Sequence, residues 1–242
     1  MNKLNYLLKS KLIKTLFMGF LFLTGYGLQA QWQPVGTVGF SAGLAFSTTL
    51  ALDAAGTPFV AYRDNANGDK ATVMKFDGAN WVNVGSPSFS VDMAYFPSLV
   101  LDAAETPFVA YMDAANGSKA TVMKFDGTNW VNVGSSGFSD GYANYTSLAL
   151  DASGTPFVAY RDNANGDKAT VMKFDGANWV NVGSAGFSAG EADYTSLALD
   201  ASGTPFVTYR DNANGDKATV MKFDGANWVD VGSPGFSLGA AK

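Results

Sequence analysis

Histidine and cysteine are both absent from the 242-residue sequence. Their absence excludes Ser-His-Asp and Cys-His nucleophilic catalysis, the usual zinc ligands, disulfide bonds and the lipid-modified cysteine of a bacterial lipoprotein. Basic residues are also few. Without the four lysines of residues 1–30, 12 lysines and arginines stand against 21 acidic residues, a net charge of −9. The lysines and arginines recur singly beside acids and form no basic cluster that could bind phosphates, so we expect no nucleic-acid partner.

The first 30 residues are typical of an export signal. Four lysines precede an apolar stretch at 16–23, and Leu28-Gln29-Ala30 is a suitable cleavage site. The apolar stretch is too short to span a bilayer, and no later stretch approaches the roughly 20 apolar residues that a membrane helix needs. We therefore expect a signal peptide at 1–30 and a mature domain at 31–242 that is secreted, or held at the cell surface or in the periplasm.

The mature chain is one unit copied four times. Tryptophan recurs every 49 residues without an insertion, at Trp32, Trp81, Trp130, Trp179 and Trp228. The copies span residues 32–80, 81–129, 130–178 and 179–227, with a partial copy at 228–242. A period of this length indicates supersecondary units that bury their apolar faces by stacking on one another.

Each copy contains four short runs rich in valine, threonine and aromatic residues, bounded by turn residues. In the third copy these runs are Ser147–Asp151, Pro156–Arg161, Ala169–Phe174 and Asn178–Val182. The three links between them have hairpin length, which predicts a four-stranded antiparallel meander.

The link from one meander to the next is longer, about a dozen residues, as in 134–146. Crossing a four-stranded sheet takes about 15 Å, and β-propeller blades are joined in this way. The sequence therefore predicts an all-β propeller of four four-stranded blades, with the first strand innermost and the tryptophan-bearing strand outermost, sealing the gap between blades. Runs of this outermost type stand at both ends, at Trp32–Val35 and Trp228–Val231. A closed ring is our first expectation; the alternative is an open arc, whose exposed apolar faces favour self-association.

Through segments such as LALDASGTPFVAYRD and MKFDGANWVNVGS, residues 32–242 resemble the bacterial secreted β-propeller repeat proteins, a kelch-like or sialidase-like superfold. The segment Asp77-Gly78-Ala79-Asn80-Trp81 resembles the Asp-box turn of sialidase-type blades, from which it departs at three positions. Neither the Gly-Gly pair of kelch repeats nor the Gly-His and Trp-Asp pairs of WD repeats occurs. The resemblance implies a fold and no single chemistry.

Most acidic residues stand in turns that recur in every copy, where an Asx turn accounts for them. They are Asp53, Asp102, Asp151 and Asp200 in the first link, and Asp77, Asp126, Asp175 and Asp224 in the third. Arginine also recurs at one position, at Arg63, Arg161 and Arg210, with Met112 in the second copy. We expect these arginines to pair with a nearby acid such as Asp64, Asp162 or Asp211.

The second link of each copy is rich in side chains with oxygen ligands, as in residues 64–69, so a Ca²⁺ site is one hypothesis for it. The spacing disagrees with an EF-hand loop, and Asn67-Gly68 instead predicts a type I′ hairpin turn. We therefore expect no cofactor.

The copies differ most in the long links, which should emerge on the same face as the second links. This variable face gives the candidate ligand-binding residues, which are aromatic or acidic. They are Tyr95, Phe96, Tyr142, Tyr145, Tyr194, Asp92, Asp140, Glu191 and Asp193. No catalytic residue is predicted.

A near-identical scaffold with divergent loops favours an exported, non-catalytic binding or adhesion module, whose partner is a glycan or a surface protein. Two alternatives stay open. One is a sialidase-like glycan hydrolase, suggested by the Asp-box-like turn and the three arginines. The other is a structural repeat segment of a larger surface protein.

Overall fold

The computed structural model describes residues 32–241, so the predicted signal peptide at residues 1–30 lies outside the described part. The chain divides into the units Met1–Pro34 and Val35–Lys242, and the second unit holds all the strands described here. Those strands form four four-stranded antiparallel sheets, which confirms the predicted all-β blades. No helix in residues 32–241 is long and apolar enough to cross a membrane.

Each sheet is one blade, and its four strands follow in chain order. Blade 1 comprises β1 (Ala45–Leu52), β2 (Pro58–Asp64), β3 (Lys70–Phe76) and β4 (Trp81–Asn83). Blade 2 comprises β5 (Ala94–Leu101), β6 (Pro107–Asp113), β7 (Lys119–Phe125) and β8 (Trp130–Asn132). Blade 3 comprises β9 (Ala143–Leu150), β10 (Pro156–Asp162), β11 (Lys168–Phe174) and β12 (Trp179–Asn181). Blade 4 comprises β13 (Ala192–Leu199), β14 (Pro205–Asp211), β15 (Lys217–Phe223) and β16 (Trp228–Asp230).

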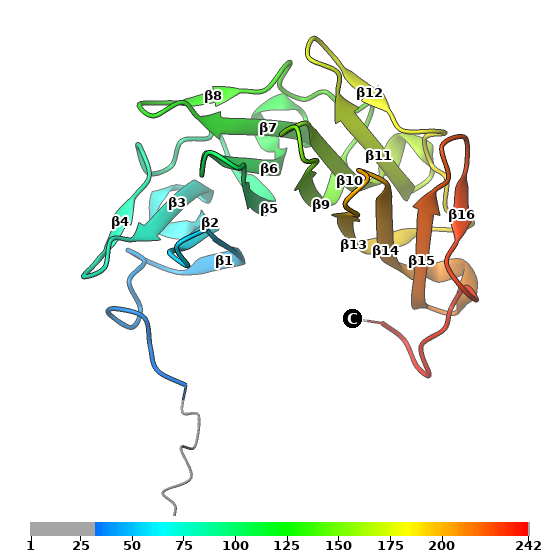
Figure 1. Cartoon of the computed structure of the whole chain (residues 1–242), viewed down its shortest axis with the longest axis horizontal. Helices are drawn as coiled ribbons and strands as arrows, with labels where there is room; N and C mark the ends of the chain where they lie inside the picture. The colour runs from blue at the N-terminus through cyan, green and yellow to red at the C-terminus, as the bar shows by residue number, and fades with distance from the viewer. Residues whose placement is uncertain (1–31, 242) are drawn as a thin grey trace, which may run out of the picture. The chain divides into compact units, whose positions relative to one another are not determined.

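The first strands of the blades lie side by side, since β1 contacts β5, β5 contacts β9 and β9 contacts β13. In Figure 1 these strands form the inner side of the second unit, and the short tryptophan-bearing strands form its outer side. The predicted order from inner to outer strand is therefore confirmed. The predicted strand Trp32–Val35 is wrong, because this segment is not a strand and each sheet already has a fourth strand of its own.

The second link of each blade is a single 3-10 turn. The four turns are η1 (Asn65–Asn67), η2 (Ala114–Asn116), η3 (Asn163–Asn165) and η4 (Asn212–Asn214). The predicted type I′ turn at Asn67-Gly68 is therefore wrong by one residue, because Asn67 belongs to the 3-10 turn. The left-handed residues are Gly68, with φ 73°, and Asp69, with φ 61°.

Alternate residues of each strand pack against the preceding and the following blade. Between blades 2 and 3, Ala110, Ala120 and Val122 lie in one buried cluster with Leu148 and Tyr160. Equivalent clusters join blades 1 and 2 and blades 3 and 4. These three interfaces are the hydrophobic core of the second unit.

Trp130, Trp179 and Trp228 seal these interfaces, as predicted, whereas Trp32 is 98% exposed. The Trp179 indole donates from Nε1 to the carbonyl oxygen of Val133 at 2.8 Å and stacks on Phe138 with ring centroids 4.0 Å apart. The side chain is 9% exposed. Trp130 and Trp228 repeat this geometry, so each indole places its apolar body in the gap and satisfies its one polar group.

The closed ring is not confirmed. Leu50 of β1 is 62% exposed, whereas its equivalents Leu99, Leu148 and Leu197 are 4%, 4% and 7% exposed. On the opposite face of blade 4, Thr208 stands where the other blades bury an alanine. The sheet face of blade 1 that carries Leu50 and the sheet face of blade 4 that carries Thr208 therefore have no covering blade within residues 32–241.

Candidate functional site

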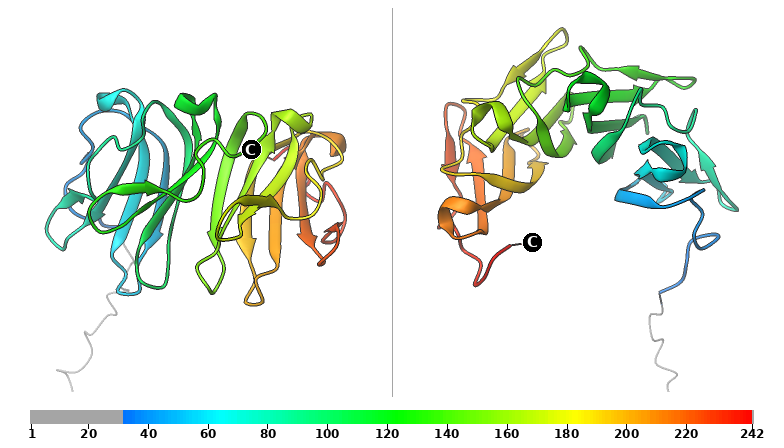
Figure 2. Two further views of the ribbon diagram at one scale, coloured as in Figure 1. Left: turned by 90° about the horizontal axis from the view of Figure 1, so that it is seen from above. Right: turned by 180° about the vertical axis from the view of Figure 1, so that it is seen from behind.

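Two sets of loops lie together on one face of the blades. The connectors between blades (residues 84–93, 133–142 and 182–191) run beside the 3-10 turns, as shown by the amide of Asn163, which donates to the carbonyl oxygen of Tyr142 at 3.1 Å. The amide of Ala143 donates to the carbonyl oxygen of Ser118, in the preceding blade, at 3.0 Å. We call this surface the connector face; in the side view of Figure 2 the 3-10 turns lie along one edge of the sheets. The other two links form the opposite edge, the turn face.

The innermost strands reach the connector face through a bulge, which carries an aromatic ring in blades 2 to 4 and Ser47 in blade 1. Phe96, Tyr145 and Tyr194 occupy equivalent positions, with φ of 51°, 54° and 53°. A left-handed conformation is strained for such bulky residues and persists only where the surroundings impose it. In blades 2 and 3 the next blade adds to its stability, because the hydroxyl of Thr146 donates to the carbonyl oxygen of Phe96, and Thr195 does the same to Tyr145.

The three rings form a row across blades 2 to 4, which we call the aromatic row. Ring centroids are 4.8 Å apart between Phe96 and Tyr145 and 4.6 Å apart between Tyr145 and Tyr194. Burial, followed by the charge of Asp193, raises the pKa of Tyr145, so its hydroxyl keeps its proton at neutral pH. The row therefore offers apolar ring faces together with phenolic hydroxyls.

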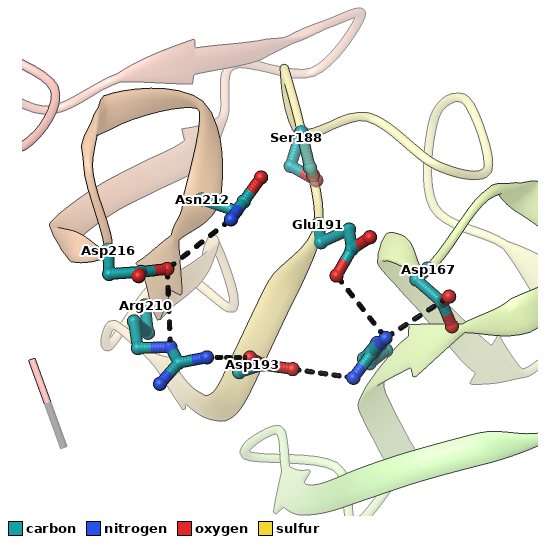
Figure 3. A network of polar contacts seen from close by, with 9 residues as sticks. Asp167, Ser188, Glu191, Asp193, Arg210, Asn212 and Asp216 are labelled. Carbon is teal, nitrogen blue, oxygen red and sulfur yellow. Dashed lines mark hydrogen bonds and ion pairs between the residues drawn. The ribbon is translucent and has the colours of Figure 1, made fainter.

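A network of ion pairs lies beside the row, at the junction of blades 3 and 4 (Figure 3). The Asp193 carboxylate bridges two guanidinium groups, with Oδ1 2.7 Å from Nη1 of Arg161 and Oδ2 2.5 Å from Nη2 of Arg210. Nη2 of Arg161 also lies 3.1 Å from Asp167 and 3.4 Å from Glu191. Burial acts to lower the pKa of Arg161, but the hydrogen bond to Asp167 and the surrounding carboxylates outweigh it, and the pKa is raised.

The equivalent arginine of blade 1 has different neighbours. The Arg63 guanidinium lies over two rings, with Cζ 4.6 Å from the centroid of Phe46 and 4.9 Å from that of Tyr95. Its Nε lies 3.4 Å from Asp69. Both distances are within the range of cation–π contacts, which stabilise this cation.

Each arginine pairs with a nearby acid, as predicted, but the partners are Asp69, Asp167 and Asp216. The partners named from the sequence, Asp64, Asp162 and Asp211, are wrong. Those acids are buried and serve the 3-10 turn: Asp162 accepts hydrogen bonds from Asn165 and Thr170, both at 2.8 Å. The reason is the twofold period of a strand, which points consecutive side chains to opposite faces.

The structure brings together six of the nine sequence-predicted site residues in contacts near the bulges. Phe96, Tyr145 and Tyr194 form the row, Tyr95 covers Arg63, and Glu191 and Asp193 pair with Arg161. These residues were expected in loops, but all except Glu191 lie in strands β5, β9 and β13.

The other three predicted residues, Asp92, Asp140 and Tyr142, are exposed on the connectors. Sequence reasoning left the arginines out of the site. Their signal was present, since arginine recurs at one position and is interrupted only by Met112.

The turn face is held by the recurring aspartates. Oδ1 of Asp53 accepts hydrogen bonds from the amides of Ala55 and Thr57 at 2.9 and 2.7 Å, and Asp77 does the same for Ala79 and Asn80. These bonds lower the pKa of both carboxyl groups. The Asx-turn interpretation is confirmed. In residues 32–241 no group of three or more acidic side chains has a geometry that could hold a metal ion.

No family model matches the sequence, and no curated protein matches it either. Solved structures do share the fold. A protein of unknown function from Dyadobacter fermentans is similar with a TM-score of 0.55 and 15% identity, over 78% of this chain and 70% of that one. Aleuria aurantia lectin in complex with Fucα1-6GlcNAc gives a TM-score of 0.55 and 18% identity, over 81% of this chain and 65% of that one.

A polysaccharide lyase of family PL25, an ulvan lyase, gives a TM-score of 0.51 and 14% identity, over 80% of this chain and 58% of that one. The chain thus spans less than two thirds of both the lectin and the lyase. At these identities the similarity shows the β-propeller-like fold alone. Because a lectin and a lyase share it, the fold does not decide between binding and catalysis.

Proposed function

We propose that the chain is a non-catalytic glycan-binding module that takes its ligand along the aromatic row of the connector face. The observation that carries the proposal is the row itself: three rings at equivalent positions, each on a residue with positive φ, and two of them, Phe96 and Tyr145, bonded through their carbonyl oxygens to the next blade. Strain of this kind clusters at ligand-binding sites. Aromatic faces with a few oriented polar groups are typical of such sites.

The polar groups beside the row support a hydrophilic ligand. Arg161 and Arg210 are fixed by Asp193, and Glu191 is exposed on the connector side of the same network. Sugars carry apolar ring faces and hydroxyls, which match rings flanked by charged donors and acceptors. The lectin among the similar structures adds support at the level of the fold.

The test uses Tyr145→Ser and Tyr194→Ser on a glycan array and by calorimetry. Serine is a matched replacement, because Ser47 occupies this bulge in blade 1 with φ 50°. Loss of two aromatic contacts should weaken binding about 5- to 150-fold, from about 0.5–1.5 kcal/mol for each ring. Tyr142→Ser, a change in an exposed tyrosine outside the row, is the control and should retain binding.

Unchanged affinity of the Tyr145→Ser, Tyr194→Ser double variant would remove the row from the site. Turnover of any glycan by the wild-type chain would replace the binding module by an enzyme. We further propose that the module is exported, on the basic, apolar and small-residue pattern of residues 1–30. A measured mass of the mature protein that does not correspond to a chain beginning at Gln31 would contradict the proposed cleavage after Ala30.

A further inference from the structure

Four equivalent positions in the second strands of the blades hold Arg63, Met112, Arg161 and Arg210. Arg161 shows what surrounds such an arginine when a complete blade follows it. Blade 4 supplies two carboxylates, Asp193 at 2.7 Å from Nη1 and Glu191 at 3.4 Å from Nη2. The terminal nitrogens of Arg161 are therefore occupied from within the chain.

At Arg63 the following blade supplies neither carboxylate. The residues of blade 2 that are equivalent to Glu191 and Asp193 are Met93 and Tyr95. The Tyr95 ring stacks on the guanidinium, and its hydroxyl lies 3.2 Å from the sulfur of Met93. Within residues 32–241 no hydrogen bond or ion pair reaches Nη1 or Nη2 of Arg63, and the Arg63–Asp69 pair uses Nε.

Arg63 is also accessible and oriented. Its side chain is 21% exposed, and on the blade 1 side the neighbouring Phe46 and Leu44 are 37% and 64% exposed. Its Cζ lies over both the Phe46 and the Tyr95 ring, and neither ring offers an acceptor oxygen to the terminal N–H groups. The terminal N–H groups of a guanidinium match the two oxygens of a carboxylate.

We propose that Arg63 binds the carboxylate of an acidic sugar, in the place that Asp193 and Glu191 take at Arg161. This inference rests on the proposed glycan-binding function and specifies its ligand class as carboxylated glycans, such as hexuronic acid oligomers. Tyr95 immediately precedes Phe96, the first ring of the aromatic row, so the Arg63 site adjoins the row along β5.

The test compares three probes by calorimetry: a hexuronic acid oligomer, its neutral methyl ester and a sulfated neutral oligomer. The wild-type chain should bind the acid about 10- to 100-fold more tightly than the ester, as expected for charge-assisted hydrogen bonds. The preference should fall as salt is raised, because it depends on charge.

Two variants remove the site in different ways. Arg63→Met copies the residue that blade 2 carries at this position, Met112. The double variant Met93→Glu, Tyr95→Asp keeps Arg63 but supplies the carboxylates of blade 4. Both should bind acid and ester equally, with affinity for the ester within about twofold of wild type. Circular dichroism and thermal unfolding establish that each variant is folded.

The outcomes separate this proposal from the proposed function. A preference for the acid that survives in both variants would overturn the role of Arg63, and tighter binding of the sulfated oligomer would overturn the choice of a carboxylate. Binding of neutral glycans with no acid preference in the wild type would remove the Arg63 site and leave the aromatic row. No binding of any glycan would remove the proposed function itself.

Discussion

Leu50 and Leu148 occupy the same position in blades 1 and 3, and the structure predicts very different consequences for truncating them. Leu148 is 4% exposed and lies in the cluster between blades 2 and 3, whereas Leu50 is 62% exposed. Leu148→Ala removes buried methyl groups and leaves a cavity between two sheets. Such a change costs about 2–5 kcal/mol of the free energy of unfolding. Leu50→Ala removes atoms that already contact water and should cost less than about 0.5 kcal/mol.

The measurement is urea unfolding followed by tryptophan fluorescence, with both variants and the wild type at the same protein concentration. The midpoint should fall strongly for Leu148→Ala and hardly at all for Leu50→Ala, with similar dependence on urea. A cost above about 1.5 kcal/mol for Leu50→Ala would refute the open face, because such a cost requires burial. Repeating the measurement over a hundredfold range of protein concentration then distinguishes the two sources of that burial. A concentration-dependent midpoint indicates a second copy on the blade 1 face, and a constant one indicates a closed ring.

Four further predictions concern stability. Asp162→Asn should cost about 1–3 kcal/mol in urea unfolding, because an amide nitrogen would then face donors such as Thr170 in a buried site. Backbone hydrogen bonds within its turn lower the pKa of Asp175. The Asp175 carboxylate therefore stabilises the fold fully above its unfolded-state pKa, and this stabilisation is lost as the pH falls through the lower folded-state pKa. The difference in free energy of unfolding between wild type and Asp175→Asn should vanish in acid. Burial and a nearby aspartate raise the pKa of Tyr62 to about 12, so stability should fall from pH 10 toward pH 12 in step with phenolate absorbance. Glu105 has φ 65° where the other blades carry glycine, and Glu105→Gly should raise the free energy of unfolding by about 1 kcal/mol.

The blades could be predicted from the sequence because their determinants are local. The turn residues, the alternating apolar residues and the single tryptophan recur at one spacing, so each copy repeats the same evidence. The predicted run Pro156–Arg161 differs from β10 by one residue, and Ala169–Phe174 differs from β11 by one residue. Four repetitions of a local pattern leave little room for another assignment.

The bulge in the innermost strands could not be predicted in this way. The predicted run Ser147–Asp151 begins four residues after β9, because Tyr145 is an aromatic residue with positive φ and no glycine marks the irregularity. The bulge is stabilised by Thr195, which is 50 residues away in the next blade. A contact so distant in the sequence leaves no local signal, so the residues of the aromatic row were named as candidates but were assigned to a loop where the structure has a strand.

The pairing of the arginines was not predictable for a similar reason. Sequence proximity suggested Asp162 for Arg161, but the strand turns these side chains to opposite sheet faces. Of the partners that the structure supplies, Asp167 lies in the turn after the same strand, and Asp193 lies 32 residues later on the next blade. Which blade follows an arginine, and which residue that blade carries at the bulge, decides whether the guanidinium is neutralised within the chain.

That dependence gives the repeats a way to differ in chemistry while keeping one fold. The arginine position lies outside the buried residues of the three interblade clusters, so exchanging arginine for methionine, as in blade 2, leaves those clusters unaltered. The position in the first strand of the following blade that faces this side chain also varies, with Tyr95, Asn144 and Asp193 in successive blades. Where arginine meets Asp193 its terminal nitrogens are engaged in an ion pair. Where Arg63 meets Tyr95 the guanidinium lies over a ring, and the one ion pair among the described residues uses Nε. The junction of blades 1 and 2 is therefore the one, among the three described, at which the repeat presents a fixed positive charge to a ligand.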